Sequence, residues 1–162
     1  MEKIIEEINA KTDLAKITIT SMPNVPGAAS ELFSLLGEAG FNIETISQFS
    51  CAKNFCDISF TIREKETDEV VEYLRSNVIF SDKELKSSIR ASDILIDKNI
   101  ALITILGKRI ATTPGFAGKI FSTVAKLGVN IETISASLMM ITFLVPKHRA
   151  DEIVNTIKQE VE

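Results

Sequence analysis

Hydrophobic and polar residues alternate along several short stretches of the chain, and this spacing is typical of half-buried strands. Ala15–Thr20 (AKITIT) and Ala101–Leu106 (ALITIL) show the alternation and are rich in β-branched residues. Two later segments, Cys56–Ile62 and Met139–Val145, place an apolar residue at every second position. The pattern therefore predicts two similar pairs of strands.

After the first strand of each pair, the spacing changes to that of an amphipathic helix. The apolar stripes consist of Ala29, Leu32, Phe33 and Leu36, and of Ala117, Ile120, Phe121 and Val124. Pro26 and Pro114 stand where these helices should begin, because proline at the first helical position needs no N–H partner. Gly40 and Gly128 stand where a helix end favours a residue with positive φ.

The two halves of the chain are copies of one sequence. Pro26–Ser47 aligns with Pro114–Ser135 without a gap, and the hexapeptide NIETIS occurs in both. Its occurrences, Asn42–Ser47 and Asn130–Ser135, should begin a second strand in each copy. Such repetition indicates one duplicated supersecondary unit. The order β-α-β-β-α-β predicts an α+β protein of two ferredoxin-like units, each an antiparallel sheet with helices on one face.

The second copy lacks a fourth strand at its end. The remaining predicted elements are helices over Thr67–Ser76 and Arg149–Val161 and a last strand of the first copy over Leu85–Ser92. An unassigned apolar segment, Ile4–Asn9, lies at the other end of the chain. We predict that it crosses over to complete the second sheet. The first unit (residues 14–92) would then be inserted in the second (1–13 and 93–162).

The outer faces of the two predicted sheets differ in polarity. The first presents Lys16, Thr18, Asp57, Ser59 and Thr61, and the second presents Leu102, Thr104, Leu138, Met140, Thr142 and Leu144. A sheet with one free face should be polar on that face. We therefore expect the second sheet to be covered, most simply by another copy of the chain in a homodimer.

Composition narrows the class of protein. The chain has 162 residues, of which 45% are hydrophobic and 25% charged, as in folded globular proteins. Its net charge of −4, without a basic block, argues against nucleic acid or a membrane as partner. The first residues are charged where a signal peptide is apolar. The two cysteines make a poor disulfide framework, so we expect a cytoplasmic protein.

The loop before each first helix should lie beside the start of the second strand, at one edge of the sheet. A helix N-terminus offers free N–H donors and a positive dipole end, which suit a carboxylate. In the first copy these donors belong to Gly27, Ala28 and Ala29. Val25 has no side-chain acceptor to cap them, whereas Thr113 is expected to cap its own helix. We therefore expect the first copy to dominate ligand binding.

The NIETIS segments add the opposite charge to this edge. Glu44 and Glu132 would bring a carboxylate, and Asn42 and Asn130 an amide, close to the N–H donors. Taken singly, glycines at turns and glutamates on strands are typical of ordinary structural and solvated positions. Taken together, they suit a zwitterion such as an amino acid.

The two stretches that begin AKITITSMPNVPG and ALITILGKRIATTPG, and that both continue to NIETIS, resemble the paired ACT domains of aspartokinase. The resemblance covers nearly the whole chain, including DISFTI at Asp57–Ile62 and the lead-in at Asp97–Gly107. No kinase segment accompanies them, so the chain looks like the separate regulatory β subunit of that family. The resemblance implies regulation of an aspartate kinase by lysine, threonine or both, bound between ACT units.

The resemblance also implies a set of effector-binding positions. They are Met22, Asn24, Val25, Gly27, Ala28, Asn42, Ile43, Glu44 and Gln48 in the first copy, and Thr113, Gly115, Asn130, Ile131, Glu132 and Ser137 in the second. The family often has aspartate in the first loop and at the third position of NIE, where this chain has Asn24, Glu44 and Glu132. Because glutamate reaches further than aspartate, the identity of the effector stays open.

No catalytic residues, metal site or cofactor site is predicted. His148 stands between basic residues at the start of a helix, which is typical of a surface position. Cys51 and Cys56 have no second pair to form a zinc site, and no Walker-type glycine loop occurs. Two other classes remain open: a free-standing ACT sensor that regulates a different enzyme or a transporter, and an enzyme on a ferredoxin-like fold.

Overall fold

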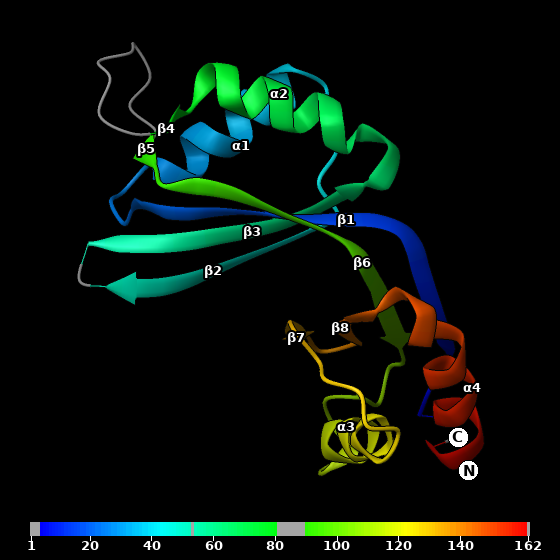
Figure 1. Cartoon of the computed structure of the whole chain (residues 1–162). Helices are drawn as coiled ribbons and strands as arrows, with labels where there is room; N and C mark the ends of the chain where they lie inside the picture. The colour runs from blue at the N-terminus through cyan, green and yellow to red at the C-terminus, as the bar shows by residue number, and fades with distance from the viewer. Residues whose placement is uncertain (1–3, 53, 81–89, 162) are drawn as a thin grey trace. The chain divides into compact units, whose positions relative to one another are not determined.

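A computed structural model describes residues 4–52, 54–80 and 90–161 of the chain (Figure 1). The chain divides into two compact units. The first unit is Asp13–Lys98, and the second combines residues up to Thr12 with Asn99–Glu162. The first unit is thus inserted in the second, as the sequence predicts.

Six strands form one mostly antiparallel sheet in the order β2-β3-β1-β6-β8-β7. Their bounds are β1 Glu7–Pro23, β2 Thr45–Ala52, β3 Phe55–Arg63, β6 Asp93–Leu106, β7 Ile134–Ala136 and β8 Met140–Pro146. A separate parallel pair is formed by β4 (Ile79–Phe80) and β5 (Arg90–Ala91). The neighbouring strands β1 and β6 are long enough for each to contribute residues to both units. Each unit therefore has the strand order of a ferredoxin-like fold.

The last strand of the first unit differs from the sequence prediction. Residues 81–89 lie outside the described part of the chain, so the prediction of a strand over Leu85–Ser92 falls mostly on residues that are not described. Its described end contains the short strand β5, Arg90–Ala91. The place beside β1 is taken by β6, which begins at Asp93. The Ser92 N–H donates to the Thr20 carbonyl at 2.8 Å and leads the chain into this pairing. One continuous strand thus ends the first unit and begins the second.

The described part of the chain contains four α-helices. They are α1 (Ala28–Glu38), α2 (Thr67–Asn77), α3 (Phe116–Lys126) and α4 (Ala150–Val161), with short 3-10 turns at Glu64–Glu66 and Lys147–Arg149. Figure 1 shows α1 and α2 on the same face of the first unit's strands. In the second unit, buried residues of α3 and α4 share one core with the inward residues of β6 and β8. The described helices are all too short or too polar to span a membrane.

In both copies the first helix is preceded by a glycine at the N-cap, and the proline lies outside the helix. Gly27 (φ 96°) and Gly115 (φ 78°) are the N-cap residues of α1 and α3, so each helix begins two residues after its proline. The expectation that Pro26 and Pro114 start the helices is therefore wrong, because a left-handed residue has to redirect the chain first. The positive φ expected after the helices is confirmed, at 85° and 68° for Gly40 and Gly128.

Each unit has its own apolar core with the same aromatic contact in it. Phe33 meets Phe60 edge-to-face at 5.7 Å in the first unit, and Phe121 meets Phe143 at 5.9 Å in the second. These pairs come from the duplicated helix and the third strand of each copy. The duplication therefore extends from the sequence to the packing.

The N-terminal segment belongs to the core of the second unit. Ile5 and Ile8 are buried there, and the Glu6 N–H donates to the Leu106 carbonyl at 2.8 Å. Gly107 makes room for this segment, because a Cβ at that position would overlap the backbone carbonyl of Ile4. A side chain at residue 107 is thus excluded by the crossover.

The outer face of the second unit is less exposed than expected. Leu102 and Leu144 pair across β6 and β8 and are buried in the single chain, at 8% and 2% exposure. They therefore give no reason to expect a second copy on this face, and that part of the prediction is wrong. Leu138 (78%) and Met140 (37%) remain exposed. The homodimer itself stays a prediction.

Candidate functional site

The loop between β1 and α1 forms a pocket of about 270 Å³ within the first unit. It is lined by Met22, Pro23, Val25, Pro26, Gly27, Ala28 and Glu31. Four of these residues (Met22, Val25, Gly27 and Ala28) belong to the predicted effector-binding set. The pocket is smaller than the roughly 300–1,000 Å³ of sites for drug-sized ligands, so it suits a ligand of amino-acid size.

The pocket combines a helix N-terminus with a carboxylate. Gly27, in the left-handed conformation, is the N-cap residue of α1 and lies in the pocket lining together with Ala28. The Ala28 N–H donates to the Val25 carbonyl in a long contact of 3.3 Å, and no side chain caps the helix. Glu31, in the first turn of α1, adds an acidic group to the lining. A positive dipole end beside a carboxylate matches the two charges of a zwitterion.

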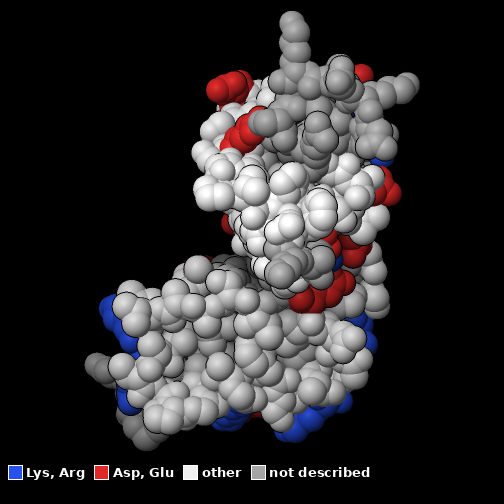
Figure 2. All heavy atoms as spheres, turned by 90° about the vertical axis from the view of Figure 1, so that its left-hand side faces the viewer, with Lys and Arg blue, Asp and Glu red and all other residues white. Residues whose placement is uncertain are grey.

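The second copy builds the same turn with opposite charge. The Phe116 N–H donates to the Thr113 carbonyl at 3.2 Å, as Ala28 does to Val25. The position equivalent to Glu31 is Lys119 in the gapless alignment of the two copies. Figure 2 shows a related contrast on one face of the molecule, where the visible basic side chains gather mostly over the second unit. Sequence reasoning missed Glu31, although the Glu-to-Lys difference was readable in the alignment.

Thr113 does not cap α3, contrary to the sequence prediction. Its hydroxyl donates to the Arg109 carbonyl at 2.8 Å, and the N-cap residue is Gly115, which offers no side-chain acceptor. The cap position lies two residues after the threonine, because the left-handed glycine adds a turn before the helix. The argument that a capped second copy would bind more weakly therefore fails.

The second strands begin at Thr45 and Ile134, so the prediction that they begin at Asn42 and Asn130 is wrong. The NIE segments precede these strands and are held in the same way in both copies. The Glu44 N–H donates to the Thr61 carbonyl at 2.9 Å, and the Glu132 N–H donates to the Leu144 carbonyl at 3.0 Å. Ile43 packs against the first core. The exposed members of the predicted set here are Asn42, Glu44, Asn130 and Glu132, and Ile131 packs against the second core. None of these residues lines the pocket at α1.

One predicted residue of the second strand, Gln48, contacts a predicted residue of the pocket loop, Asn24. The Gln48 amide on β2 donates to the Asn24 side-chain oxygen at 3.3 Å, so the second strand and the loop are in contact. In the second unit, the Ser137 N–H donates to the Met140 carbonyl at 2.8 Å and closes the turn that leads into β8. The structure thus joins Asn24 and Gln48 to the loop of the pocket.

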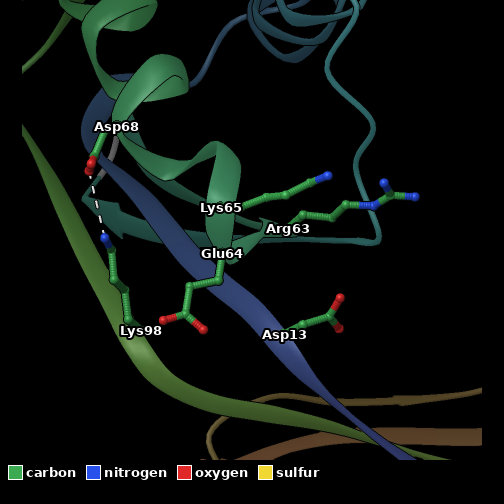
Figure 3. Close-up of a pocket in the computed structure, with 6 residues that line it drawn as sticks. All are labelled: Asp13, Arg63, Glu64, Lys65, Asp68 and Lys98. Atoms are coloured by element: carbon green, nitrogen blue, oxygen red, sulfur yellow. Dashed lines mark ion pairs between the residues drawn. The ribbon is translucent and has the colours of Figure 1, made fainter.

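A second, larger pocket of about 480 Å³ lies at the far end of the first unit (Figure 3). Its lining is charged: Asp13, Arg63, Glu64, Lys65, Asp68 and Lys98. Lys98 and Asp68 form an ion pair at 3.6 Å, and Figure 3 shows Arg63 and Lys65 extending together away from that pair. Exposed ion pairs of this kind contribute little to stability. The pocket contains none of the predicted effector-binding residues.

The groups considered for catalysis or metal binding are placed as follows. His148 is exposed before α4. Cys56 is buried, and burial, assisted by the neighbouring Asp57 carboxylate, raises the pKa of its thiol. Among the described residues, no three His, Cys, Asp or Glu side chains are grouped so that they could hold a metal ion.

Comparison with known proteins gives the class of this fold. A model of the ACT domain family matches the chain twice, at residues 17–78 and 103–161. The chain therefore belongs to the ACT domain family. Within that family, its similarity is to the regulatory region of aspartate kinases.

Three relatives illustrate this similarity. The chain is 34% identical to the bifunctional aspartokinase/homoserine dehydrogenase 2 of Arabidopsis thaliana and 30% identical to the aspartokinase of Mycolicibacterium smegmatis. The matches cover 87% and 90% of this chain but only 15% and 33% of those relatives. The regulatory subunit of aspartate kinase from Thermus thermophilus, in its ligand-free form, superimposes with a TM-score of 0.84. That match has 26% identity and covers 99% of this chain and 100% of that one.

Proposed function

We propose that this protein is an amino-acid-binding regulatory subunit that places an aspartate kinase under feedback control by lysine, threonine or both. The observation that carries the proposal is the pocket at the start of α1, where uncapped helix N–H groups and the Glu31 carboxylate line a cavity of about 270 Å³. The similarity to a separate regulatory subunit over its whole length supports the same function.

In this proposal the effector's carboxylate binds at the N-terminus of α1, near Gly27 and Ala28. Its ammonium groups face acidic side chains, of which Glu31 lies in the pocket lining. The other residues of the effector site are Met22, Asn24, Val25, Asn42, Ile43, Glu44 and Gln48, with Thr113, Gly115, Asn130, Ile131, Glu132 and Ser137 at the second copy. The chain regulates and does not itself catalyse a reaction.

The proposed partners are an aspartate kinase catalytic chain and a second copy of this chain, in the cytoplasm. The exposed apolar residues Ile134, Leu138 and Met139 are available for the homodimer contact. Neither nucleic acid nor a membrane is a proposed partner.

Calorimetric titration with the twenty amino acids tests the binding step. We expect saturable binding of lysine, threonine or both, and no binding of the other amino acids. Co-purification with an aspartate kinase catalytic chain, and inhibition of that kinase by the bound effector, test the regulatory step. Binding without kinase association would instead favour the free-standing sensor.

A further inference from the structure

The first strand of the first unit contains a β-bulge just before it reaches the pocket. In the pairing of β1 with β3, Ile19 lies opposite Ile58 and Met22 lies opposite Cys56. Two residues of β1 therefore face one residue of β3, which is Asp57. A bulge of this kind redirects the side chains that follow it.

The bulge determines which side chain reaches the pocket. Ile17, Ile19 and Met22 are all fully buried, so the inward-facing position moves from residue 21 to residue 22. In a regular strand, alternation would place Ser21 inward and Met22 outward. Met22 packs in the first core and lines the pocket because of this extra residue. The broken alternation between Ile19 and Met22 is the sequence signal of the bulge.

A side-chain carboxylate bonds the backbone of the bulge. Ser21 has φ 56°, which makes it the one non-glycine residue with positive φ in the described part of the chain. Residues with a Cβ disfavour this left-handed conformation. The Ser21 N–H donates to the Asp57 carboxylate at 2.9 Å, in a part-buried position. A bond to a charged acceptor is stronger than a neutral one and opposes the conformational cost at Ser21.

The equivalent residue of the second copy, Gly107, does not have positive φ, so the second copy does not repeat this turn. Aligning Ala15–Thr20 with Ala101–Leu106 places Gly107 at the position of Ser21. The Gly107 N–H donates to the backbone carbonyl of Met139 at 2.9 Å. The bond from the backbone of this turn to a side-chain carboxylate is therefore a feature of the first unit, where the pocket lies.

We propose that Asp57 is a positioning residue for effector binding. Through Ser21 it holds the bulge that turns Met22 into the pocket and presents the loop to α1. This inference rests on the proposed function, because it concerns the affinity of the same pocket. It adds a residue that does not line the pocket and that acts only through the backbone.

Three variants of the full chain test the role, with titration of lysine and of threonine. Asp57→Ala should weaken binding of the effector about tenfold or more, the factor that corresponds to about 1.4 kcal/mol. Asp57→Asn keeps an oxygen acceptor for the Ser21 N–H and should bind close to the wild-type level. Adding Ser21→Gly to Asp57→Ala should recover much of the lost affinity, because glycine adopts positive φ without cost.

A neighbouring contact supplies the matched control. Ser59 and Thr18 bond through their hydroxyls at 2.7 Å on the same two strands, away from the bulge. Ser59→Ala should lower the melting temperature without weakening effector binding. The methyl resonance of Met22, observed with labelled methionine in the ligand-free protein, should shift in Asp57→Ala and return in the double variant.

The outcomes separate the two proposals. If the wild-type protein binds no amino acid, the proposed function fails, and the positioning role fails with it. If the wild type binds and Asp57→Ala binds equally well, only the positioning role is overturned. An unchanged Met22 resonance in Asp57→Ala would overturn it as well. An equal loss of affinity in Ser59→Ala would show a general effect of strand stability and would also overturn it.

Discussion

Replacing Gly107 with alanine should release the N-terminal segment from the second unit. A Cβ at this position would overlap the Ile4 carbonyl, and the atoms that would have to move belong to the backbone. Moving them displaces Ile5, which is 2% exposed, and breaks the bond from the Glu6 N–H to the Leu106 carbonyl. The clash therefore acts on the contact that closes the second unit.

The expected cost follows from these two losses. Burial of one isoleucine contributes about 1.5–3 kcal/mol, and a backbone hydrogen bond contributes about 0.5–1.5 kcal/mol net. We expect Gly107→Ala to lower the free energy of unfolding by about 2–4 kcal/mol, a large share of the roughly 5–15 kcal/mol typical of folded proteins. At about 2–4 °C per kcal/mol, the melting temperature should fall by roughly 5–15 °C.

The matched control is Gly118→Ala in helix α3 of the same unit. A Cβ there meets nothing within 4 Å, and alanine is a better helix former than glycine by about 0.5–1 kcal/mol. The two alanine variants should therefore change stability in opposite directions in urea denaturation. Hydrogen exchange should also become faster across Met140–Pro146 in Gly107→Ala. If Gly107→Ala unfolds at the wild-type midpoint while Gly118→Ala is stabilised, the placement of Ile4 against residue 107 is wrong.

Three further predictions concern the ligand, the assembly and a thiol. Glu31→Lys should weaken lysine binding about tenfold or more and affect threonine binding much less. The control variant Lys119→Glu should not reproduce that loss. Equal losses for both ligands would show that Glu31 does not recognise the charge of lysine. Leu138→Asp should convert a homodimer to a monomer in light scattering, because it puts a charge on a side chain that is 78% exposed; a wild-type monomer would refute the assembly. In a Cys51→Ser background, Cys56 should react with a thiol reagent only at higher pH than a free thiol does. Burial raises the pKa of Cys56 and leaves less thiolate at a given pH. Urea unfolding should remove this difference, and fast labelling of the folded protein would contradict the burial of Cys56.

The architecture could be predicted because each copy repeats the same signals. Alternation, the helical stripe and the glycine after the helix occur twice, so each copy supports the assignment of the other. The fourth strand of the first unit could not be placed in this way. Asp93–Leu106 contains one strand that serves both copies, and a search for separate strands divides it.

The candidate site could be located only in part. The sequence identified the loop that contains Met22, Val25 and Gly27, which lines the pocket. It did not show that Thr113 bonds the preceding turn, because a hydroxyl can donate backwards as well as accept forwards. It also overlooked Glu31, whose role depends on which side of the helix faces the loop. The partner of a hydroxyl and the side of a helix that faces a loop are determined by tertiary packing and not by residue type.

The insertion of one unit in the other has a consequence for synthesis on the ribosome. The segment that holds Ile5 and Ile8 is translated before the first unit, yet the strands and helices it completes are translated after that unit. Asp13–Lys98 emerges as an uninterrupted stretch and has its own core, so it can fold while translation continues. Ile5 and Ile8 then stay without their partners until Asn99–Glu162 has been made. Folding of the second unit therefore has to wait until the first unit has been synthesised, and the apolar segment that contains Ile5 and Ile8 lacks its core during that time.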